Sequence, residues 1–316
     1  MYVNNYMMTT DVHVSGAPLR IFHYQTVKKA YPSMRGYLEE LNQPSCKIVW
    51  KRLLEEPRGH NNMVLCIVTP PISPGADAGL LFRNTNGDTS VPVHGLIGIA
   101  TVLAETGYFR KEDYSFDCIN GQYHVHVDFD NESQKAVQVR VKQTLTLGLI
   151  SDKELQFETI TWRLNKDTII VLPAEHFNVT LTIEDLNRIK SEAENFFRRL
   201  SNHGEKVSHI LLYQKNTENR HMFLTIDKEG YIDRSPLSGA GAFATYLDNI
   251  GLASGQKRLT VSNFLGHQAT VEFSNIQREG LCSTYTLAVG GQGFITGFHR
   301  FVVDQTDPLK DGFLIK

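Results

Sequence analysis

The stretch Val91-Pro92-Val93-His94-Gly95-Leu96-Ile97-Gly98-Ile99-Ala100 leads into helix-like sequence that closes on Gly107. A second stretch, Ser238-Gly239-Ala240-Gly241-Ala242-Phe243-Ala244, follows Asp233-Arg234-Ser235-Pro236 and leads into helix-like sequence that closes on Gly251. A Gly-rich turn that opens a helix presents backbone N–H groups without partners, so each stretch is a ready anion site. Two such helix starts, about 145 residues apart, predict a duplicated fold with an anion held between its halves.

Further short motifs flank these two stretches. They are Asp11-Val12-His13-Val14-Ser15-Gly16-Ala17-Pro18-Leu19-Arg20, Glu56-Pro57-Arg58-Gly59-His60, Pro70-Pro71, Ala76-Asp77-Ala78-Gly79, Ile295-Thr296-Gly297 and Asp307-Pro308. In this order they resemble the proline racemase family, which shares its fold with diaminopimelate epimerase. The resemblance covers nearly the whole chain, although Ala17 stands where the family has a glutamate.

The resemblance implies an α+β fold with two pseudo-symmetric domains. Each domain would be a curved, mostly antiparallel sheet wrapped round a central helix, Gly95–Glu105 in one and Gly241–Ile250 in the other. We expect a first domain over residues 1–125 and a second over 126–296, with a final strand at about 297–316 returning to the first. The ligand cleft would lie between the two domains.

Members of this family remove the α-proton of proline or a hydroxyproline with one cysteine and return a proton with another, without a cofactor. The first cysteine position falls on Pro92. The second falls on Leu237 when counted from Asp233, or on Ser238 when counted back from Gly241. No cysteine occupies any of these positions, since the four in the chain are Cys46, Cys66, Cys118 and Cys282.

The loss of both thiols matters chemically. A thiol has an ordinary pKa of about 8.5 and reaches the thiolate near neutral pH at a helix N-terminus. A serine hydroxyl serves as a base only if another group takes its proton, and a two-base racemisation needs a competent group on each face. Relatives that dehydrate 3-hydroxyproline keep one cysteine and use threonine for the other, so loss of one thiol is compatible with elimination.

Recognition of an amino acid is better retained than proton transfer. The resemblance implies that backbone N–H groups of the two turns hold the substrate carboxylate, and Val93-His94-Gly95 and Gly239-Ala240-Gly241 would serve, although Val93 replaces a glycine. It also implies that His94 and Asp233 meet the amine, a charge-assisted contact. We therefore take Ser238, Asp233 and His94 as catalytic candidates.

Each candidate also has a structural interpretation. His94 could satisfy its own turn, and Asp233 could cap the turn before Arg234. Ser238 is most simply a helix N-cap, because serine there accepts a hydrogen bond from an N–H two or three residues later. We interpret the Glu56–His60 motif as architectural, a loop that pins the preceding helix to the core.

Three functions remain open. The first is an enzyme acting on a cyclic amino acid as epimerase or dehydratase, with Asp233, His94 or a hydroxyl such as Ser238 or Thr89 replacing the thiols. The second is a protein that binds an amino acid without turning it over, or an inactive partner of a family member. The third is an enzyme with a changed reaction, which would account for Ala17, Val93 and the extra residue near Leu237.

Composition excludes several classes. With 316 residues and a net charge of −2, the chain is long enough for two domains and lacks the Lys/Arg runs of a nucleic-acid surface. The cysteines lack CxxC spacing, which favours a reducing compartment. We find no signal sequence between Met1 and Asp11 and no apolar run of about 18 residues. We therefore expect a cytoplasmic protein with an amino-acid ligand, no membrane or nucleic-acid partner, and a homodimeric state by resemblance.

Periodicity predicts strand-rich structure. Tyr123–Asp130 alternates apolar and polar residues, as in a half-buried strand. Its polar face carries His124, His126 and Asp128, which have the spacing of metal ligands. A solvated face explains these three residues better, so we predict no metal site. Further strands are expected over 137–146 and 207–213. The longest helix should run from about Ile183 to Leu200, with Thr182 and Asp185 as a cap pair and one face made by Leu186, Ile189, Ala193 and Phe197. A second helix is expected over Met34–Leu41.

Overall fold

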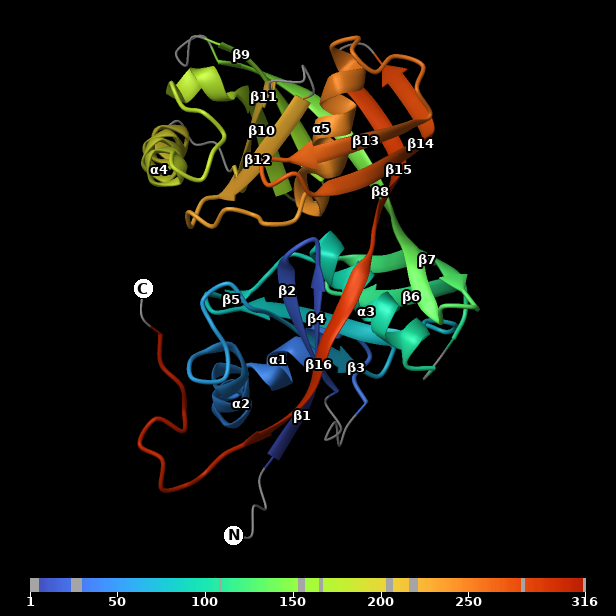
Figure 1. The fold of residues 1–316 in the computed structure, drawn as a ribbon, viewed down its shortest axis with the longest axis vertical. Helices are drawn as coiled ribbons and strands as arrows, with labels where there is room; N and C mark the ends of the chain where they lie inside the picture. Colours follow the sequence, from blue (N-terminus) through green and yellow to red (C-terminus); the bar gives the residue numbers. More distant parts are fainter. Residues whose placement is uncertain are drawn as a thin grey trace. The chain divides into compact units, whose positions relative to one another are not determined.

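The two Gly-rich stretches form the starts of two buried helices, α3 (Val93–Glu105) and α5 (Leu237–Asn249), each surrounded by strands (Figure 1). In α3 every residue from Val93 to Ala104 is buried. A helix that is apolar all round is stable only inside a core, which explains why strands surround both. The helices begin two and four residues before the predicted starts. They end near Gly107 and Gly251, whose positive φ angles of 71° and 81° suit glycine.

The computed structural model describes residues 6–23, 30–107, 110–152, 157–164, 167–202, 207–215, 221–279 and 282–314. The chain divides into a first unit of Met1–Val141 with Gln292–Lys316, and a second unit of Lys142–Gly291. The sequence predicts a boundary near residue 125. The first unit extends further because the strand Gly121–Asp130 pairs with Asp113–Cys118 in a hairpin.

In the first unit the strands follow the order β16-β1-β2-β3-β4-β6-β7-β8. Their bounds are β1 Tyr6–Val14, β2 Ala17–His23, β3 Val64–Thr69, β4 Ala78–Asn84, β5 Gly87–Asp88, β6 Asp113–Cys118, β7 Gly121–Asp130, β8 Lys135–Asp152 and β16 Gly293–Val302. The short β5 pairs with β4, and β8 continues into the second unit. Strand β16 returns from the far end of the sequence and pairs antiparallel with β1.

In the second unit the order is β8-β9-β10-β11-β12-β13-β14-β15, and β15 also pairs with β8. The bounds are β9 Phe157–Leu164, β10 Asp167–Pro173, β11 His209–Lys215, β12 His221–Asp227, β13 Arg258–Asn263, β14 Gln268–Glu279 and β15 Cys282–Gly291. The strands predicted over 137–146 and 207–213 correspond to β8 and β11.

The two units repeat one pairing scheme. In the first, β1–β2 is antiparallel, β2–β3 parallel, β3–β4 antiparallel, β4–β6 parallel and β6–β7 antiparallel. In the second, antiparallel and parallel pairings alternate in the same order, from β9–β10 through β10–β11, β11–β12 and β12–β13 to β13–β14. In both, the central helix connects the second strand of an antiparallel pair to a parallel neighbour. The predicted α+β duplication is therefore present.

A further helical layer covers each sheet. In the first unit, α1 (Met34–Leu41) and α2 (Pro44–Leu54) bury Tyr37, Trp50 and Leu53 against the sheet. The bounds of α1 match the prediction. Pro44 begins α2, because the N–H that proline lacks has no partner at the first helical position.

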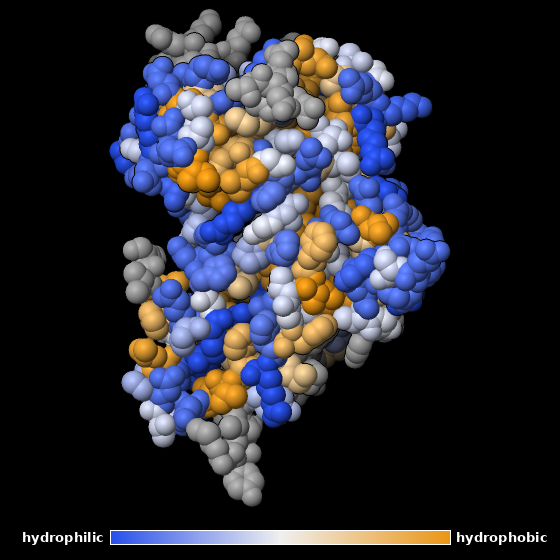
Figure 2. All heavy atoms as spheres, viewed as in Figure 1, coloured by the Kyte–Doolittle hydropathy of each residue, from blue (hydrophilic) through white to orange (hydrophobic). Residues whose placement is uncertain are grey.

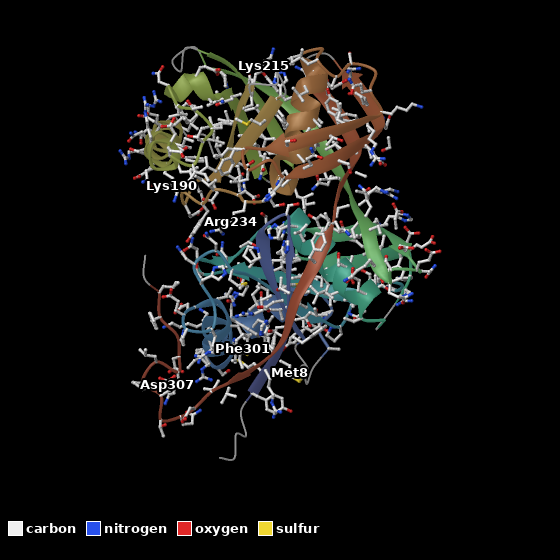
Figure 3. All side chains as sticks on the ribbon, viewed as in Figure 1. Met8, Lys190, Lys215, Arg234, Phe301 and Asp307 are labelled. Carbon is white, nitrogen blue, oxygen red and sulfur yellow. The ribbon has the colours of Figure 1, made fainter. Side chains whose placement is uncertain are left out.

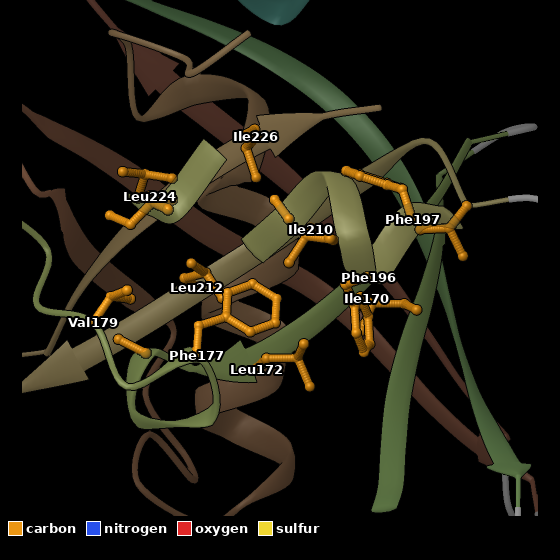
Figure 4. Packing of buried hydrophobic residues seen from close by; sticks show 14 of the residues in the cluster. Ile170, Leu172, Phe177, Val179, Phe196, Phe197, Ile210, Leu212, Leu224 and Ile226 are labelled. Carbon is orange, nitrogen blue, oxygen red and sulfur yellow. The ribbon is translucent and has the colours of Figure 1, made fainter. Parts of the chain in front are cut away.

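In the second unit, α4 (Leu186–Asn202) and the short helix η1 (Ala174–Phe177) cover β10, β11 and β12, and Phe177 and Phe196 pack edge to face in this core (Figure 4). Hydrophilic residues cover the outer side of α4 (Figure 2). The predicted apolar face is present, but the predicted cap pair is wrong. The helix begins at Leu186, and the Asp185 carboxylate accepts a hydrogen bond at 2.7 Å from the Thr180 N–H instead of pairing with Thr182.

The Glu56–His60 motif is architectural, as predicted. The Gly59 N–H donates to the Glu55 carbonyl at 2.7 Å, and the Arg58 Nε donates to the Arg52 carbonyl at 3.1 Å, so the motif closes the end of α2. Glu56 also forms an isolated bridge with Phe313 near the C-terminus.

The polar face of β7 forms an ion-pair ladder across β6, β7 and β8. His126 lies 2.8 Å from Asp113 and 3.2 Å from Asp128, and Arg140 binds both oxygens of Asp128 at 2.6 and 2.7 Å. This fits a solvated face. None of the helices in the described part of the chain has the length and apolar character of a membrane span.

Candidate functional site

The first group of candidate residues lies at the N-terminus of α3. Pro92 is the N-cap, and its carbonyl accepts hydrogen bonds from the Gly95 and Leu96 N–H groups at 3.0 and 3.2 Å. Val93 and His94 lie in the first turn and are 4% and 7% exposed. A Cβ on Gly95 would lie 2.5 Å from the Phe82 ring on β4, so only glycine lets the helix start approach the sheet this closely.

The second group of candidate residues lies at the N-terminus of α5. This helix begins at Leu237 with Pro236 as N-cap, and the Pro236 carbonyl accepts from the Ala240 N–H at 2.8 Å. The interpretation of Ser238 as the N-cap is therefore wrong, because Ser238 lies inside the first turn. Leu237 is fully buried, so its side chain belongs to the core.

The two helix starts pack on their sheets through one glycine each. A Cβ on Gly239 would lie 2.7 Å from the Phe223 ring on β12, as one on Gly95 would meet Phe82 on β4. Since β4 and β12 occupy equivalent places in the repeated pairing scheme, Gly239 corresponds to Gly95 and Pro236 to Pro92. Both central helices thus have a proline at the N-cap.

Asp233 lies on a hairpin that leads into α5. The Asp233 N–H donates to the Thr225 carbonyl at 2.9 Å, Ile226 and Ile232 form a bridge, and the Asp227 N–H donates to the Tyr231 carbonyl at 3.0 Å. The Asp233 carboxylate accepts from the Ser235 N–H at 2.9 Å. The expected structural role of Asp233 in this turn is therefore present, and its second oxygen has no hydrogen-bond partner among the described residues.

The segment between Asp233 and α5 is held from β13. The carbonyl of Arg234, which lies on this segment (Figure 3), accepts from the Asn263 side-chain amide at 2.7 Å and contacts the His267 Nδ1 at 3.1 Å. Asn263 is 2% exposed and also accepts from the Leu265 and His267 N–H groups. These bonds fix the approach of the chain to the helix start.

Sequence reasoning missed two polar residues on this hairpin, Thr225 and Asp227. Thr225 is 3% exposed, and its hydroxyl has no hydrogen-bond partner among the described residues. Burial, with the charges of Glu229 and Asp233, raises the pKa of Asp227 to about 6, although a hydrogen bond from the Tyr231 N–H opposes this shift. The turn signal in Asp227-Lys228-Glu229-Gly230 could have identified the hairpin, since Gly230 has a φ of 83°.

The candidates thus form two groups. Pro92, Val93, His94 and Gly95 lie together in the first unit, and Asp233, Ser238, Gly239, Ala240 and Gly241 lie together in the second. Thr89, the other hydroxyl considered, donates to the Ser90 carbonyl at 2.9 Å and is half-buried. Each group offers backbone N–H donors of a first helical turn beside an ionisable side chain, an arrangement suited to a carboxylate.

A family model described as proline racemase matches residues 9–160 and 172–314. The chain belongs to the proline racemase family. A trans-3-hydroxy-L-proline dehydratase of Bacillus thuringiensis subsp. konkukian is 28% identical, with 100% of both chains covered. A proline racemase of Acetoanaerobium sticklandii is 25% identical over 96% of this chain and 97% of the relative.

Solved structures agree on the fold of this proline racemase family member. A hydroxyproline epimerase from Agrobacterium vitis, crystallised with trans-4-OH-L-proline, aligns with a TM-score of 0.80 at 18% identity, covering 100% of this chain and 96% of that one. A Bacillus anthracis protein of the PhzF family aligns with a TM-score of 0.59 at 11% identity, covering 94% and 99%. These likenesses establish the two-unit α+β architecture.

Proposed function

We propose that this protein acts on a small cyclic amino acid such as proline or hydroxyproline by cofactor-independent α-proton chemistry, as a racemase, epimerase or dehydratase. One observation carries this: each unit offers a central helix whose first turn presents backbone N–H groups beside an ionisable side chain, His94 or Asp233, in a chain that matches the family along its length. The curated relatives named above are racemases and dehydratases.

In this proposal the Gly239 N–H group at the start of α5 binds the ligand carboxylate, and the Val93 and His94 N–H groups at the start of α3 are donors of the same kind. The Gly95 and Ala240 N–H groups, which the sequence also suggested, donate instead to the Pro92 and Pro236 carbonyls at 3.0 and 2.8 Å. The Ser238 and Gly239 N–H groups have no acceptor among the described residues, which supports such a role. Asp233 supplies the counter-charge for the ligand ammonium.

The test uses Asp233→Ala and Ser238→Ala. Asp233→Ala should abolish ligand binding and turnover, because the ammonium loses its counter-charge, whereas binding that survives would remove Asp233 from the site. Ser238→Ala separates two roles: activity lost with binding kept supports proton transfer by Ser238, and no change leaves Ser238 as a residue of the turn. Calorimetry reports binding, and chiral chromatography reports turnover.

A second candidate is an amino-acid-binding protein without turnover. The residue at the first cysteine position favours it, because Pro92 carries neither acid nor base. Restoring thiols tests it directly in the double variant Pro92→Cys, Ser238→Cys. Racemisation that appears only in this variant would support the binding protein, whereas activity already present in the unchanged chain would exclude it.

Two finer expectations stay predictions: a homodimeric state and a cytoplasmic location. Light scattering of the purified protein reports the first, since a 35.7 kDa chain gives about 70 kDa as a dimer. Fractionation of the source cells reports the second.

A further inference from the structure

We propose that Asp227 is the proton-transferring group of the second unit, in the place of the missing thiol. This rests on the proposed function and names a residue for it. Four groups on one face of the unit carry the inference: the Asp227 carboxylate, the Asp233 carboxylate, the buried Thr225 hydroxyl and the free N–H groups at the start of α5.

The hairpin register sets these groups on one face. Thr225 lies opposite Asp233 and Asp227 opposite Tyr231, through the hydrogen bonds at 2.9 and 3.0 Å described above. In antiparallel strands, residues two apart on one strand and their opposite neighbours share a face. Asp227, Thr225 and Asp233 therefore project to the same side.

That side faces the start of α5. A Cβ on Gly239 would meet the Thr225 hydroxyl at 2.5 Å and Leu211 on β11 at 3.1 Å, so the face that carries Thr225 packs on the first helical turn. Asp227 is the next residue on this face beyond Thr225, and its opposite neighbour on β11 is His209. Asp227 thus ends β12, one same-face position beyond the residue that packs on the first turn of α5.

The Thr225 hydroxyl indicates a ligand here independently of the acidic pair. Burying a hydroxyl without a hydrogen bond costs free energy, so natural structures rarely do it without a functional reason. Thr225 is 3% exposed and has no partner among the described residues. A polar atom of the ligand, at the unpaired N–H groups of Ser238 and Gly239, would satisfy this side chain.

The carboxylate pair is suited to divided roles. Asp227 accepts hydrogen bonds from the Glu229 and Tyr231 N–H groups at 3.0 and 2.8 Å through one oxygen, so its other oxygen remains available. Burial and the negative charges of Glu229 and Asp233 raise the pKa of Asp227 to about 6. A base works best when its pKa lies near the working pH, and paired titratable groups with separated pKa values often divide acid and base roles.

The step balances within the ligand and this carboxylate. The ligand Cα–H bond breaks, its proton forms an O–H bond on Asp227, and the electron pair moves into the ligand carboxylate, which the helix N–H groups stabilise. Return of the proton from Asp227 restores the ligand. In deuterated water the Asp227 proton exchanges with solvent, so the ligand acquires an α-deuteron on the same face.

The decisive variant is Asp227→Asn, because the amide oxygen still accepts the two turn N–H bonds but is not a base. The matched control is Asp130→Asn in the first unit, where Asp130 accepts the Glu132 and Ser133 N–H groups at 3.1 Å in a comparable turn. With L-proline and the hydroxyprolines as probes, Asp227→Asn should lower α-proton exchange by about 100-fold or more and change binding by less than about threefold. Asp130→Asn should change neither.

Exchange at the wild-type rate in folded Asp227→Asn overturns the inference and leaves the proposed function standing. Silence of the wild type overturns both. A second readout needs no variant: wild-type exchange should rise with pH around a midpoint near 6, and a flat profile between about pH 5 and 8 would also overturn the role of Asp227. The titratable groups that face Asp227 are Glu229, Asp233, Tyr231 and His209, and the Asp227→Asn profile separates their contribution.

Discussion

The surroundings of Asp227 disfavour its charged form, so the free energy of unfolding should depend on the ionisation of this residue. Because burial raises its pKa to about 6, the folded protein holds a proton that the unfolded chain releases near pH 4. The contribution of Asp227 to the free energy of unfolding is fully present below about pH 4, and it is lost as the pH rises through about 6. Asp227→Asn should therefore stabilise the protein at pH 7 by up to about 3 kcal/mol and have little effect at pH 4.

Urea unfolding of both proteins at the two pH values measures this difference. An equal effect of the substitution at pH 4 and pH 7 would contradict the raised pKa. A gain in stability together with a loss of exchange would be typical of a functional group retained at a cost in stability.

Arg20 and Asp11 form a buried pair whose role is structural. The guanidinium binds Asp11 at 2.7 and 3.0 Å, donates to the Leu53 and Arg58 carbonyls at 2.6 Å, and lies 4.4 Å from the ring centre of Phe301 on β16. Removing one partner of such a pair leaves a buried charge uncompensated. Asp11→Asn should lower the free energy of unfolding by about 3 kcal/mol.

The control is the exposed helical pair of Arg198 and Glu194, 3.0 Å apart. Glu194→Gln should change stability by no more than about 0.5 kcal/mol. Guanidinium unfolding compares the two variants, and equal small effects would show that the Arg20 contacts contribute little.

At the level of elements, the central helices require glycine in their first turn. A Cβ on Gly239 would lie 2.5 Å from the Thr225 hydroxyl and 2.7 Å from the Phe223 ring. Gly239→Ala should therefore shift the helix start and cost about 1–3 kcal/mol, as overpacking does. Ser238→Ala, one residue earlier, is the control for the local helix preference.

Thermal unfolding followed by circular dichroism measures both variants. A Gly239→Ala protein as stable as the wild type would contradict the close packing of α5 on β12. The same substitution should weaken ligand binding if the first-turn N–H groups bind the carboxylate, since they would move with the helix.

The sequence predicts those helices and strands whose ends or faces are marked by a local residue pattern. Glycine and proline mark the ends of α1, α3 and α5, and the apolar alternation of β7 is a local pattern, so these were predictable. The start of α4 was not, because Asp185 satisfies the backbone of Thr180 rather than its own helix. The N-cap at Pro236 was missed because a serine two residues later offered a more common cap.

At the scale of the whole molecule, the duplicated scheme could be predicted from two helix starts and the flanking motifs. The roles of Thr225 and Asp227 could not be predicted from the sequence. They depend on a hairpin register that brings residues 225 and 233 opposite each other. Strand pairing of this kind is set by tertiary contacts rather than by composition. The correspondence of Pro92 and Pro236 likewise required the packing of Gly95 and Gly239.

We propose above that this chain performs α-proton chemistry on a cyclic amino acid without the two thiols of its family. Proton NMR of the purified protein with L-proline, D-proline and the 3- and 4-hydroxyprolines in deuterated water tests it most directly. We expect the α-hydrogen signal to disappear or a product to form, and we expect neither change in Asp233→Ala. No exchange with any of these ligands, together with ligand-induced shifts in the protein spectrum, would contradict it and indicate a binding protein.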